Sequence, residues 1–233
     1  LNEAMTFQKF FRNFYFGNFF IGSPIFDRLA SSKMYQMRIV STLNMKYPRT
    51  LFSNRKEEIL QFAKKFNKII IKPIQGDGII YNDEIYPLYS ILLDFDKLHN
   101  LPEKSFESSI NYFQEYIPKL FELRVTAVCG EIFACKIDSQ LQDEETGKID
   151  WRQGYDYGLK HSIFDLPNNI KDFCSRYLKS MNLNFGCFDF IFTPEGEYVF
   201  LECNPNGQWL WIEEETGMPI SKAIADALVR GSW

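Results

Sequence analysis

Phe188-Asp189-Phe190 and Leu201-Glu202-Cys203-Asn204-Pro205-Asn206 are the two segments that decide the fold of this chain. A proline and then a glycine lie between them, and the residues on both sides alternate with a period of two, which predicts an antiparallel hairpin. Counting outward from that turn sets Asp189 roughly opposite Glu202. Glu202 and Asn204 are two residues apart, so they share a face of their strand. The pattern therefore gathers three oxygen-bearing side chains in a hairpin that is otherwise apolar.

Two carboxylates at that distance repel each other unless a cation lies between them. A hard divalent ion such as Mg²⁺ prefers oxygen ligands and is commonly held beside a nucleotide phosphate. The cluster of Asp189, Glu202 and Asn204 therefore predicts a magnesium site. The alternative interpretation is an edge hairpin whose acidic side chains are merely solvated.

The overall composition restricts the class of protein. The 233 residues are 45% apolar and 24% charged, which is typical of one large globular unit or two small lobes with a real core. The net charge of -4 and the lack of a basic run argue against a general nucleic-acid surface. No apolar run has transmembrane length and no signal-peptide pattern begins the chain, so we expect no membrane partner.

Cysteine and histidine usage points to a reducing compartment. The five cysteines contain no C-x-x-C pair, which indicates neither a disulfide framework nor a zinc site. The two histidines, His99 and His161, are too far apart in sequence for a helical metal motif. We therefore expect a cytoplasmic protein.

The first segment is rich in aromatic residues. At helical spacing stand Phe7, Phe10, Phe11, Phe14 and Tyr15, and Phe16, Phe19 and Phe20 follow them. Such a face needs a cover, which a missing N-terminal portion or a partner subunit could supply. A homodimer is therefore one expectation, and packing within this chain is the other.

The next segments are expected to alternate between helices and strands. A helix opens at Lys33, and a capping pair of Asn54 and Glu57 opens another. Ile69-Ile70-Ile71 predicts a buried strand that ends in Lys72-Pro73, ahead of a loop with two glycines. Lys72 is well placed there to meet a phosphate, although a lysine leaving a strand is more often plain surface.

The second half begins with a predicted hairpin over 122–137 that turns at Cys129-Gly130-Glu131. The polar stretch from Asp138 to Lys148 is expected to be a mobile loop. Asp150-Trp151-Arg152 places an aromatic residue between opposite charges, for which a surface salt bridge is the commoner outcome. Helices are predicted around Tyr177 and from Pro219 onward, and 213–215 is expected to be a solvated acidic run.

The order of these features resembles the ATP-grasp ligases over about Pro24 to Leu228, and within them most the graspetide (microviridin-type) peptide maturases. The ribosomal-protein glutamate ligases are similar. The motifs that carry the resemblance are, in chain order, Lys33, Lys72-Pro73, Gln114-Glu115-Tyr116-Ile117, Glu122-Leu123-Arg124, Lys136-Ile137-Asp138-Ser139-Gln140, Asp150-Trp151-Arg152, Asp189 and Glu202-Cys203-Asn204.

The resemblance implies a role for each matching position. Lys33 and Lys72 would contact the ATP phosphates, the backbone of Glu115, Tyr116 and Ile117 would read the adenine edge, and Glu122 would hold the ribose. Arg124 and Arg152 would steady the transferring phosphoryl group or the acyl phosphate, with Lys136 a weaker candidate. Asp189, Glu202 and Asn204 would bind Mg²⁺.

The resemblance also implies a fold and a domain division. The fold class is α+β, with two lobes of mostly antiparallel sheet that clamp ATP. Residues 24–113 would form the first lobe and 114–233 the second, which carries the magnesium hairpin. Residues 1–23 would be the remnant of a preceding domain, otherwise missing, or a linker helix. The loops 75–82 and 138–149 are candidates for a cover, although the first has few glycines for such a role.

The implied activity is ATP-dependent ligation through an acyl phosphate. The partner would be a precursor peptide with a leader and a core that is acidic and carries Ser, Thr or Lys, and the product would be a side-chain ester or amide macrocycle. Two alternatives remain open at this stage. One is a ligase that adds amino acids such as glutamate to a protein tail, and the other is a non-catalytic peptide-binding relative.

Overall fold

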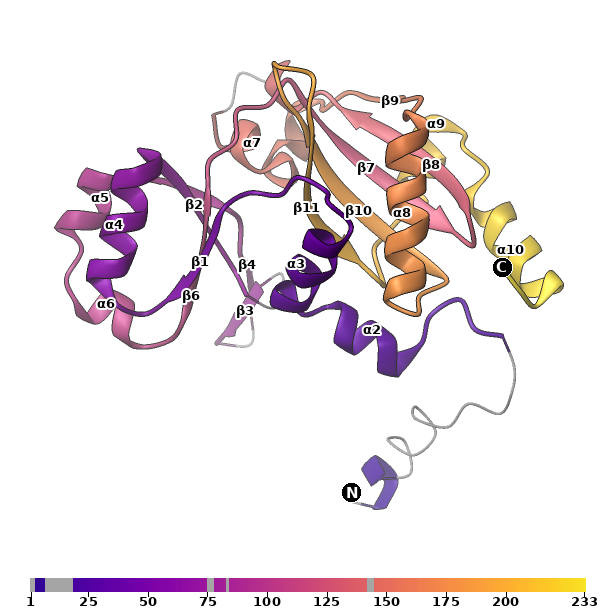
Figure 1. Ribbon diagram of the computed structural model, residues 1–233, viewed down its shortest axis with the longest axis horizontal. Coiled ribbons are helices and arrows are strands. Elements are labelled where there is room, and N and C mark those ends of the chain that lie inside the picture. The colour runs from indigo at the N-terminus through magenta and orange to yellow at the C-terminus, as the bar shows by residue number, and fades with distance from the viewer. Residues whose placement is uncertain (1–2, 7–18, 75–77, 83, 142–144) are drawn as a thin grey trace.

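The computed structural model describes residues 3–6, 19–74, 78–82, 84–141 and 145–233 (Figure 1). The aromatic run predicted to be helical from Phe7 to Phe16 lies outside these residues. Phe19 and Ile21 pack against an apolar cluster that contains Val128, Phe185 and Ala227. This part of the N-terminal segment is therefore covered within the chain.

The described chain folds into helices on two antiparallel sheets and one separate hairpin. The helices are α2 (Pro24–Ala30), α3 (Lys33–Thr42), α4 (Lys56–Phe66), α5 (Phe95–Asn100), α6 (Lys104–Glu107), α7 (Glu145–Ile149), α8 (Asn168–Ser180), α9 (Leu210–Thr216) and α10 (Ile220–Arg230), with short 3₁₀ segments η1 (Ser139–Leu141) and η2 (Trp151–Tyr157). The strands are β1 (Thr50–Ser53), β2 (Lys68–Lys72), β3 (Gly78–Tyr81), β4 (Glu84–Pro87), β5 (Ile91–Asp94), β6 (Asn111–Glu115), β7 (Phe121–Val128), β8 (Glu131–Ile137), β9 (His161–Ile163), β10 (Phe185–Phe192) and β11 (Tyr198–Asn204).

The smaller sheet has the strand order β1-β6-β2-β5 and is covered by α4, α5 and α6 (Figure 1). We call this unit the first lobe. Helix α4 forms because its apolar residues recur at helical spacing, and Ile59 and Ala63 are fully buried against Ile69 and Phe113. Acidic residues in its first turn and lysines in its last turn also suit the helix dipole.

The capping pair predicted for α4 is wrong. The helix begins at Lys56 with Arg55 at the N-cap position, and no side chain caps it. The Ser53 hydroxyl instead accepts from the Arg55 N–H at 3.0 Å and donates to the Glu58 carboxylate at 2.7 Å. Ser53 makes these contacts in place of Asn54 because the chain leaves β1 at Ser53, one residue before Asn54.

The larger sheet has the strand order β11-β10-β7-β8-β9, and all its neighbouring strands are antiparallel. We call this unit the second lobe. Helix α8 covers one face (Figure 1), and its Phe173 packs edge-on against Phe188, Phe190 and Phe200. Burying each such ring stabilises the fold by about 1.5–3 kcal/mol. The opposite face is covered in part by α9 and α10, and it also carries Glu122, Arg124 and Asp189.

The predicted hairpin is confirmed as β10 and β11, and Asp189 lies opposite Glu202 as predicted, by way of a bulge. Strict counting from the Phe192–Tyr198 pair would set Asp189 opposite Leu201. In the structure Phe190 pairs with Phe200 and Asp189 pairs with Glu202, so one extra residue is inserted in β11. The bulge turns Glu202 onto the face of Asp189 while Phe200 stays in the core.

Helices α2 and α3 pack on the second lobe, although residues from 24 onward were predicted to belong to the first. Ala30 and Val40 lie in the same core cluster as Phe188 and Tyr177. The buried Gln36 anchors α3 on β11, because its amide donates to the Cys203 carbonyl at 2.8 Å and accepts from the Cys203 N–H at 3.0 Å.

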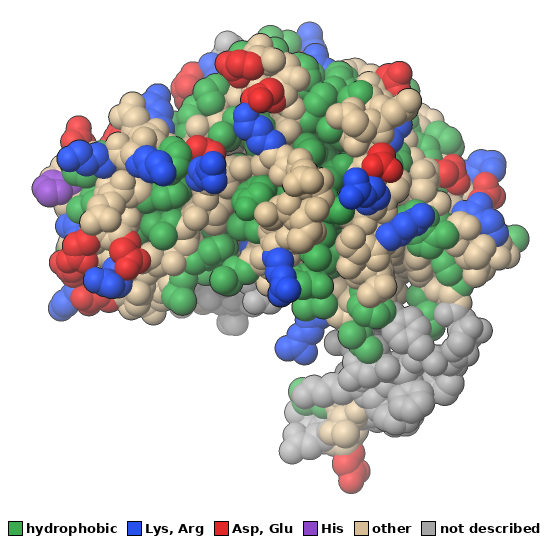
Figure 2. All heavy atoms as spheres, in the orientation of Figure 1, with side chains coloured by type: hydrophobic (Ala, Val, Ile, Leu, Met, Phe, Trp, Pro, Cys, Tyr) green, Lys and Arg blue, Asp and Glu red, His purple; other side chains and the backbone are tan. Residues whose placement is uncertain are grey.

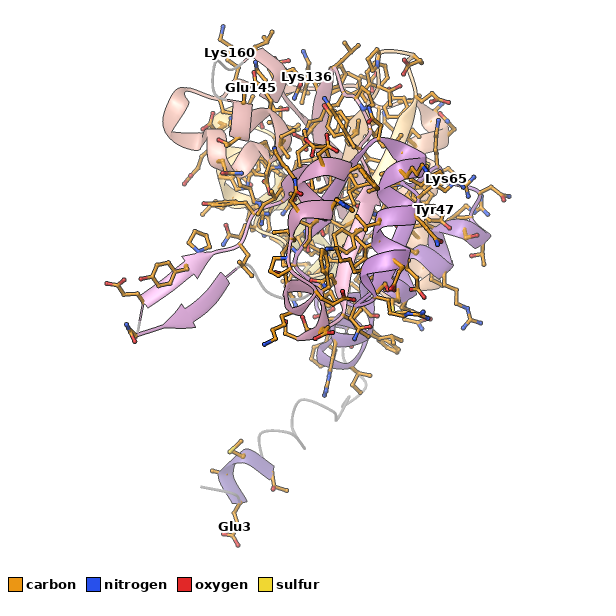
Figure 3. All side chains as sticks on the ribbon, turned by 90° about the vertical axis from the view of Figure 1, so that its left-hand side faces the viewer. Glu3, Tyr47, Lys65, Lys136, Glu145 and Lys160 are labelled. Carbon is orange, nitrogen blue, oxygen red and sulfur yellow. The ribbon has the colours of Figure 1, made fainter. Side chains whose placement is uncertain are left out.

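The polar segment predicted as a mobile loop carries structure. The stretch after Asp138 forms η1 and α7 over its described residues, so the prediction of a mobile loop there is wrong for them. Residues 78–87 form the β3–β4 hairpin, which extends away from the body of the molecule (Figure 3). The acidic run 213–215 lies on α9, where Glu213 accepts from Ser221 at 2.7 Å and Glu215 contacts His161 at 3.2 Å.

Charges of both signs are interspersed over the face shown in Figure 2. This distribution agrees with the modest net charge of -4. Within the described part of the chain, no helix is both long enough and apolar enough to cross a membrane.

Candidate active site

A cavity of about 780 Å³ lies between the two lobes. Its first-lobe wall comes from β2, β6 and the β4–β5 connection, and its second-lobe wall from β7, β10, β11 and the segment after α7. Predicted site residues on this lining are Lys33, Lys72, Glu115, Tyr116, Ile117, Glu122, Arg124, Arg152, Asp189, Glu202 and Asn204. The structure thus brings together all but one of the predicted site residues.

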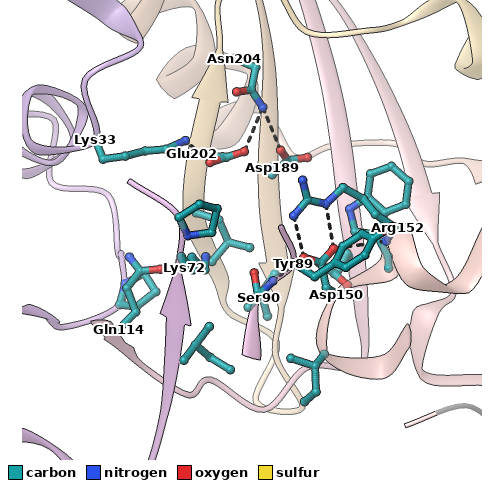
Figure 4. A pocket seen from close by; sticks show the side chains of 18 of the residues that line it. Lys33, Lys72, Tyr89, Ser90, Gln114, Asp150, Arg152, Asp189, Glu202 and Asn204 are labelled. Carbon is teal, nitrogen blue, oxygen red and sulfur yellow. Dashed lines mark hydrogen bonds and ion pairs between the residues drawn. The ribbon is translucent and has the colours of Figure 1, made fainter. Parts of the chain in front are cut away.

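The acidic hairpin supplies one end of the cavity (Figure 4). The Asn204 amide lies 3.0 Å from Glu202 and 3.4 Å from Asp189, so the three side chains converge. Arg124, opposite Asp189 on β7, donates to both oxygens of that carboxylate at 3.0 and 2.8 Å. Lys33 comes from α3, one turn before Gln36, and forms an ion pair with Glu202.

The two carboxylates differ in their pKa. Burial raises the pKa of Asp189 to about 6, against the opposing effect of Arg124. Burial acts in the same sense on Glu202, but Lys33, Lys72 and Asn204 outweigh it and lower the pKa of Glu202 to about 2. Each acid therefore depends on a cation from a different element, which the hairpin alone does not provide.

The donor set fits a magnesium ion. Asp189 and Glu202 present carboxylate oxygens to one space, and the Asn204 amide points into the same space. Turning that amide over would present its oxygen there, because nitrogen and oxygen occupy equivalent positions. Hard oxygen ligands of this kind are those that Mg²⁺ prefers.

Lys72 reaches the same space from the opposite lobe. It lies at the end of β2, lines the cavity and faces the hairpin (Figure 4). Burial lowers its pKa, although Glu202 acts to raise it. Among the described residues no hydrogen bond or ion pair of its ammonium occurs. A buried ammonium in that state is set up to receive an anion.

The segment that joins the lobes lies along the cavity at 115–117. The N–H groups of Glu115 and Tyr116 donate to the carbonyls of Arg49 and Lys68, at 3.0 and 3.1 Å. Of the three residues whose backbone is predicted to read adenine, Ile117 is the one whose N–H has no acceptor among the described residues.

Gln114, just before this segment, is a site residue that the sequence analysis did not assign. It is 1% exposed, and its side-chain carbonyl oxygen has no hydrogen-bond partner in the described chain. Its amide nitrogen lies 3.3 Å from the Thr50 hydroxyl. A buried acceptor without a partner costs about 1–3 kcal/mol, which a ligand donor would recover.

Asp150 and Arg152 line the cavity beside Tyr89 and Ser90 of the β4–β5 connection (Figure 4). Asp150 accepts from Arg152 at 2.9 and 2.7 Å and from the N–H of Ser90 in the first lobe at 2.9 Å. These contacts lower the pKa of Asp150 despite its burial. Arg152 also lies over the ring of Tyr89, 5.6 Å from its centroid. The motif predicted as a possible surface salt bridge therefore bridges the lobes.

Lys136 is the predicted residue that the structure leaves out. It pairs with Leu123 on β7, so it lies on the α8 face of the sheet, opposite to Arg124. Its ammonium contacts Asp138 at 2.6 Å and lies 4.8 Å from the centre of the Phe121 ring. The predicted catalytic role of Lys136 is not compatible with this position, because alternate residues of a strand face opposite sides.

Comparison with known proteins identifies the fold. No family model matches the chain. The chain is 30% identical to the glutathione synthetase of Wigglesworthia glossinidia brevipalpis over 178 residues, which are 73% of this chain and 52% of that protein. With its two antiparallel sheets and the cavity between them, the chain has the fold of the ATP-grasp ligases.

Within that class the chain is similar to ligases associated with ribosomally made peptides. One is the Chryseobacterium gregarium RiPP-associated ATP-grasp ligase in complex with ADP and a leader and core peptide, with a TM-score of 0.83 and 30% identity over 92% of this chain and 64% of that one. Another is the macrocyclase MdnC of Microcystis aeruginosa bound with precursor peptide MdnA, with a TM-score of 0.76 and 32% identity over 89% of this chain and 64% of that one. The chain thus spans between half and two thirds of these relatives.

Proposed function

We propose that this chain is the nucleotide-binding and catalytic part of an ATP-dependent carboxylate ligase that crosslinks side chains of a ribosomally made precursor peptide. One observation carries the proposal: the acidic hairpin of the second lobe faces the unpaired Lys72 of the first lobe across a shared cavity. The similarity to one ligase solved with ADP and a leader and core peptide, and to another solved with a precursor peptide, supports the same conclusion.

ATP would lie between the lobes with its base along 114–117 and its phosphates toward the hairpin. Lys72 and Lys33 would contact the phosphates as counter-charges. Glu122 would hold the ribose hydroxyls. Mg²⁺ would be held by Asp189, Glu202 and Asn204, and when bound it supplies positive charge that neutralises phosphate oxygens.

The reaction would proceed in two steps. An Asp or Glu carboxylate of the peptide attacks the γ-phosphorus, the bond to the β-phosphate oxygen breaks, and an acyl phosphate and ADP form. A Ser or Thr hydroxyl, or a Lys amine, then attacks the acyl carbon and displaces phosphate, losing its proton as the ester or amide forms. Each crosslink therefore removes one water from the peptide.

Arg124 and Arg152 would steady the charge that moves in these steps. Arg124 already shares a carboxylate with the magnesium group, so it would act from the metal end of the cavity. Arg152 is held by Asp150 and also lines the cavity, where it would meet the acyl group of the peptide. A closed site matters here because water would hydrolyse the acyl phosphate.

The proposal is tested by mass spectrometry with ATP, Mg²⁺ and a candidate precursor encoded beside the gene, rich in Asp, Glu, Ser and Thr. We expect the peptide to lose the mass of one water per bond, and no change without ATP. A gain of whole amino-acid residues would instead support a ligase that adds residues to a chain end. That second function is favoured by 20% identity over 86% of this chain to the tetrahydromethanopterin:alpha-L-glutamate ligase of Methanocaldococcus jannaschii.

A non-catalytic peptide-binding relative is the remaining alternative. It predicts no ADP release under any condition, and it predicts that the Asp189→Asn variant binds the peptide as the wild type does. Binding alone does not require the oxygen cluster and the buried lysine that the cavity contains.

Gln114→Met is expected to reduce base selectivity. The side-chain carbonyl oxygen of Gln114, which has no partner in the described chain, can accept a hydrogen bond from the exocyclic amine of adenine. It would repel the oxygen at the same position of guanine. We expect the variant to bind ATP about tenfold more weakly, with little change for GTP. Calorimetric dissociation constants for both nucleotides test this, and an unchanged ATP to GTP ratio would contradict it.

A further inference from the structure

Lys119 is a buried cation that none of the roles above uses. It lies on the cavity lining between the 115–117 segment and β7, and its side chain is only 4% exposed. Its ammonium donates to Glu122 at 2.7 Å and to the carbonyl of Ile149 at 3.0 Å. These two acceptors come from different parts of the second lobe, so one ammonium joins them.

The first acceptor is a carboxylate in apolar surroundings. Glu122 lies in register with Ile191 on β10 and Ile137 on β8, and its side chain is 8% exposed. A buried carboxylate without a cationic partner is strongly unfavourable. Lys119 engages one of its oxygens, and within the described chain no other group hydrogen-bonds that side chain. The second oxygen is therefore left for a ligand.

The second acceptor lies at the C-terminal end of α7. The carbonyl of Ile149 is one of the last carbonyls of that helix, where a cation is favourable. The next residue is Asp150, which holds both Arg152 and the Ser90 N–H of the first lobe. The Lys119 ammonium thus connects Glu122 to the segment that carries Arg152.

We propose that Lys119 is a positioning residue that orients Glu122 toward the nucleotide ribose and ties that contact to the Asp150–Arg152 segment. Occupation of the ribose site then orders the end of the cavity that meets the acyl group. The inference rests on the nucleotide-binding half of the proposed function and needs no peptide.

The test compares Lys119→Met with a matched control, Lys148→Met. Lys148 also forms a lysine–glutamate pair at a spacing of three, with Glu145 at 2.6 Å, but Glu145 is 83% exposed and the pair lies on the surface of α7. Both substitutions replace a lysine with an uncharged side chain of similar length. Calorimetry with Mg²⁺ then measures the dissociation constants of ATP and 2′,3′-dideoxy-ATP for each full-length variant.

We expect the wild type and Lys148→Met to bind ATP at least about tenfold more tightly than the dideoxy nucleotide, because a charged acceptor bonds the hydroxyls. In Lys119→Met this ratio should fall below about threefold by the same reasoning. Hydrogen exchange should show that ATP protects 145–152 in the wild type and the control but not in Lys119→Met.

If Lys119→Met does not fold, Lys119→Met/Glu122→Gln replaces it, since it leaves no buried carboxylate unpaired. The double variant should bind both nucleotides equally and show no ATP-dependent protection at 145–152. A wild-type ratio together with wild-type protection in either folded variant would overturn the role of Lys119. If the wild type bound neither nucleotide, the proposed function itself would be overturned.

Discussion

Glu202→Gln is expected to lower the rate of ATP turnover by about two to three orders of magnitude, the range typical for loss of one charge-stabilising group in an active site. The substitution keeps the shape of the side chain but removes the charge that pairs with Lys33 and that would hold Mg²⁺. The Mg²⁺ concentration for half-maximal rate should rise as well. ADP release at saturating ATP, measured over a series of Mg²⁺ concentrations, checks both expectations.

Glu197→Gln is the matched control for this variant. It makes the same chemical change at the start of the same hairpin, where the Glu197 side chain is 49% exposed and pairs with the exposed Lys46. Exposed pairs of this kind contribute about 1 kcal/mol or less. We expect unaltered turnover in the control. Near-normal turnover in a folded Glu202→Gln protein would refute the assignment of the hairpin as the magnesium end of the site.

Gly207→Ala is expected to destabilise the protein by about 3 kcal/mol or more and to abolish turnover. A Cβ atom at this position would lie 2.4 Å from Cys187 Cβ and 2.9 Å from the Arg124 guanidinium. The loop after β11 must therefore move away from β10. Because the Gln208 carbonyl accepts from Arg124 at 3.3 Å, that movement also displaces the arginine from its place beside Asp189.

Gly217→Ala is the control that distinguishes the steric clash at Gly207 from ordinary backbone strain. Gly217 has φ +72° at the end of α9, and a Cβ there would meet nothing within 4 Å. Its substitution should cost only about 1–2 kcal/mol, the penalty for a left-handed conformation. Chemical denaturation measures both free energies of unfolding. Equal losses in the two variants would mean that the close packing at Gly207 is not what the site depends on.

The sequence predicted the elements of the site well where the signal was local. Alternation identified β10 and β11, the Pro–Gly turn identified their connection, and Gly196 indeed adopts φ +82° there. The residues that carry oxygen or positive charge could also be chosen by type and by their order along the chain. The strand ending in Lys72 was found in the same way.

Other features could not be found from local patterns. Lys136 was a weaker candidate than Arg124 for the same role, and the pleat of β8 places it on the other face of the sheet. Gln114 and Lys119 carry ordinary polar signals, and only burial shows that one has an acceptor without a partner and the other joins two segments. The sequence hints were that Gln114 stands in one of the matched motifs and that Lys119 lies between two of them.

By itself, then, the sequence determined which strands form, which side chains can bind a cation or a phosphate, and the ATP-grasp class to which their order belongs. The tertiary structure alone decided that Lys72 and the hairpin face each other and how Glu202, predicted to lie opposite Asp189, comes onto the same face. The first depends on contacts between lobes that are distant in sequence. The second depends on a single bulge, which shifts the register by one residue and so reverses the face of Glu202.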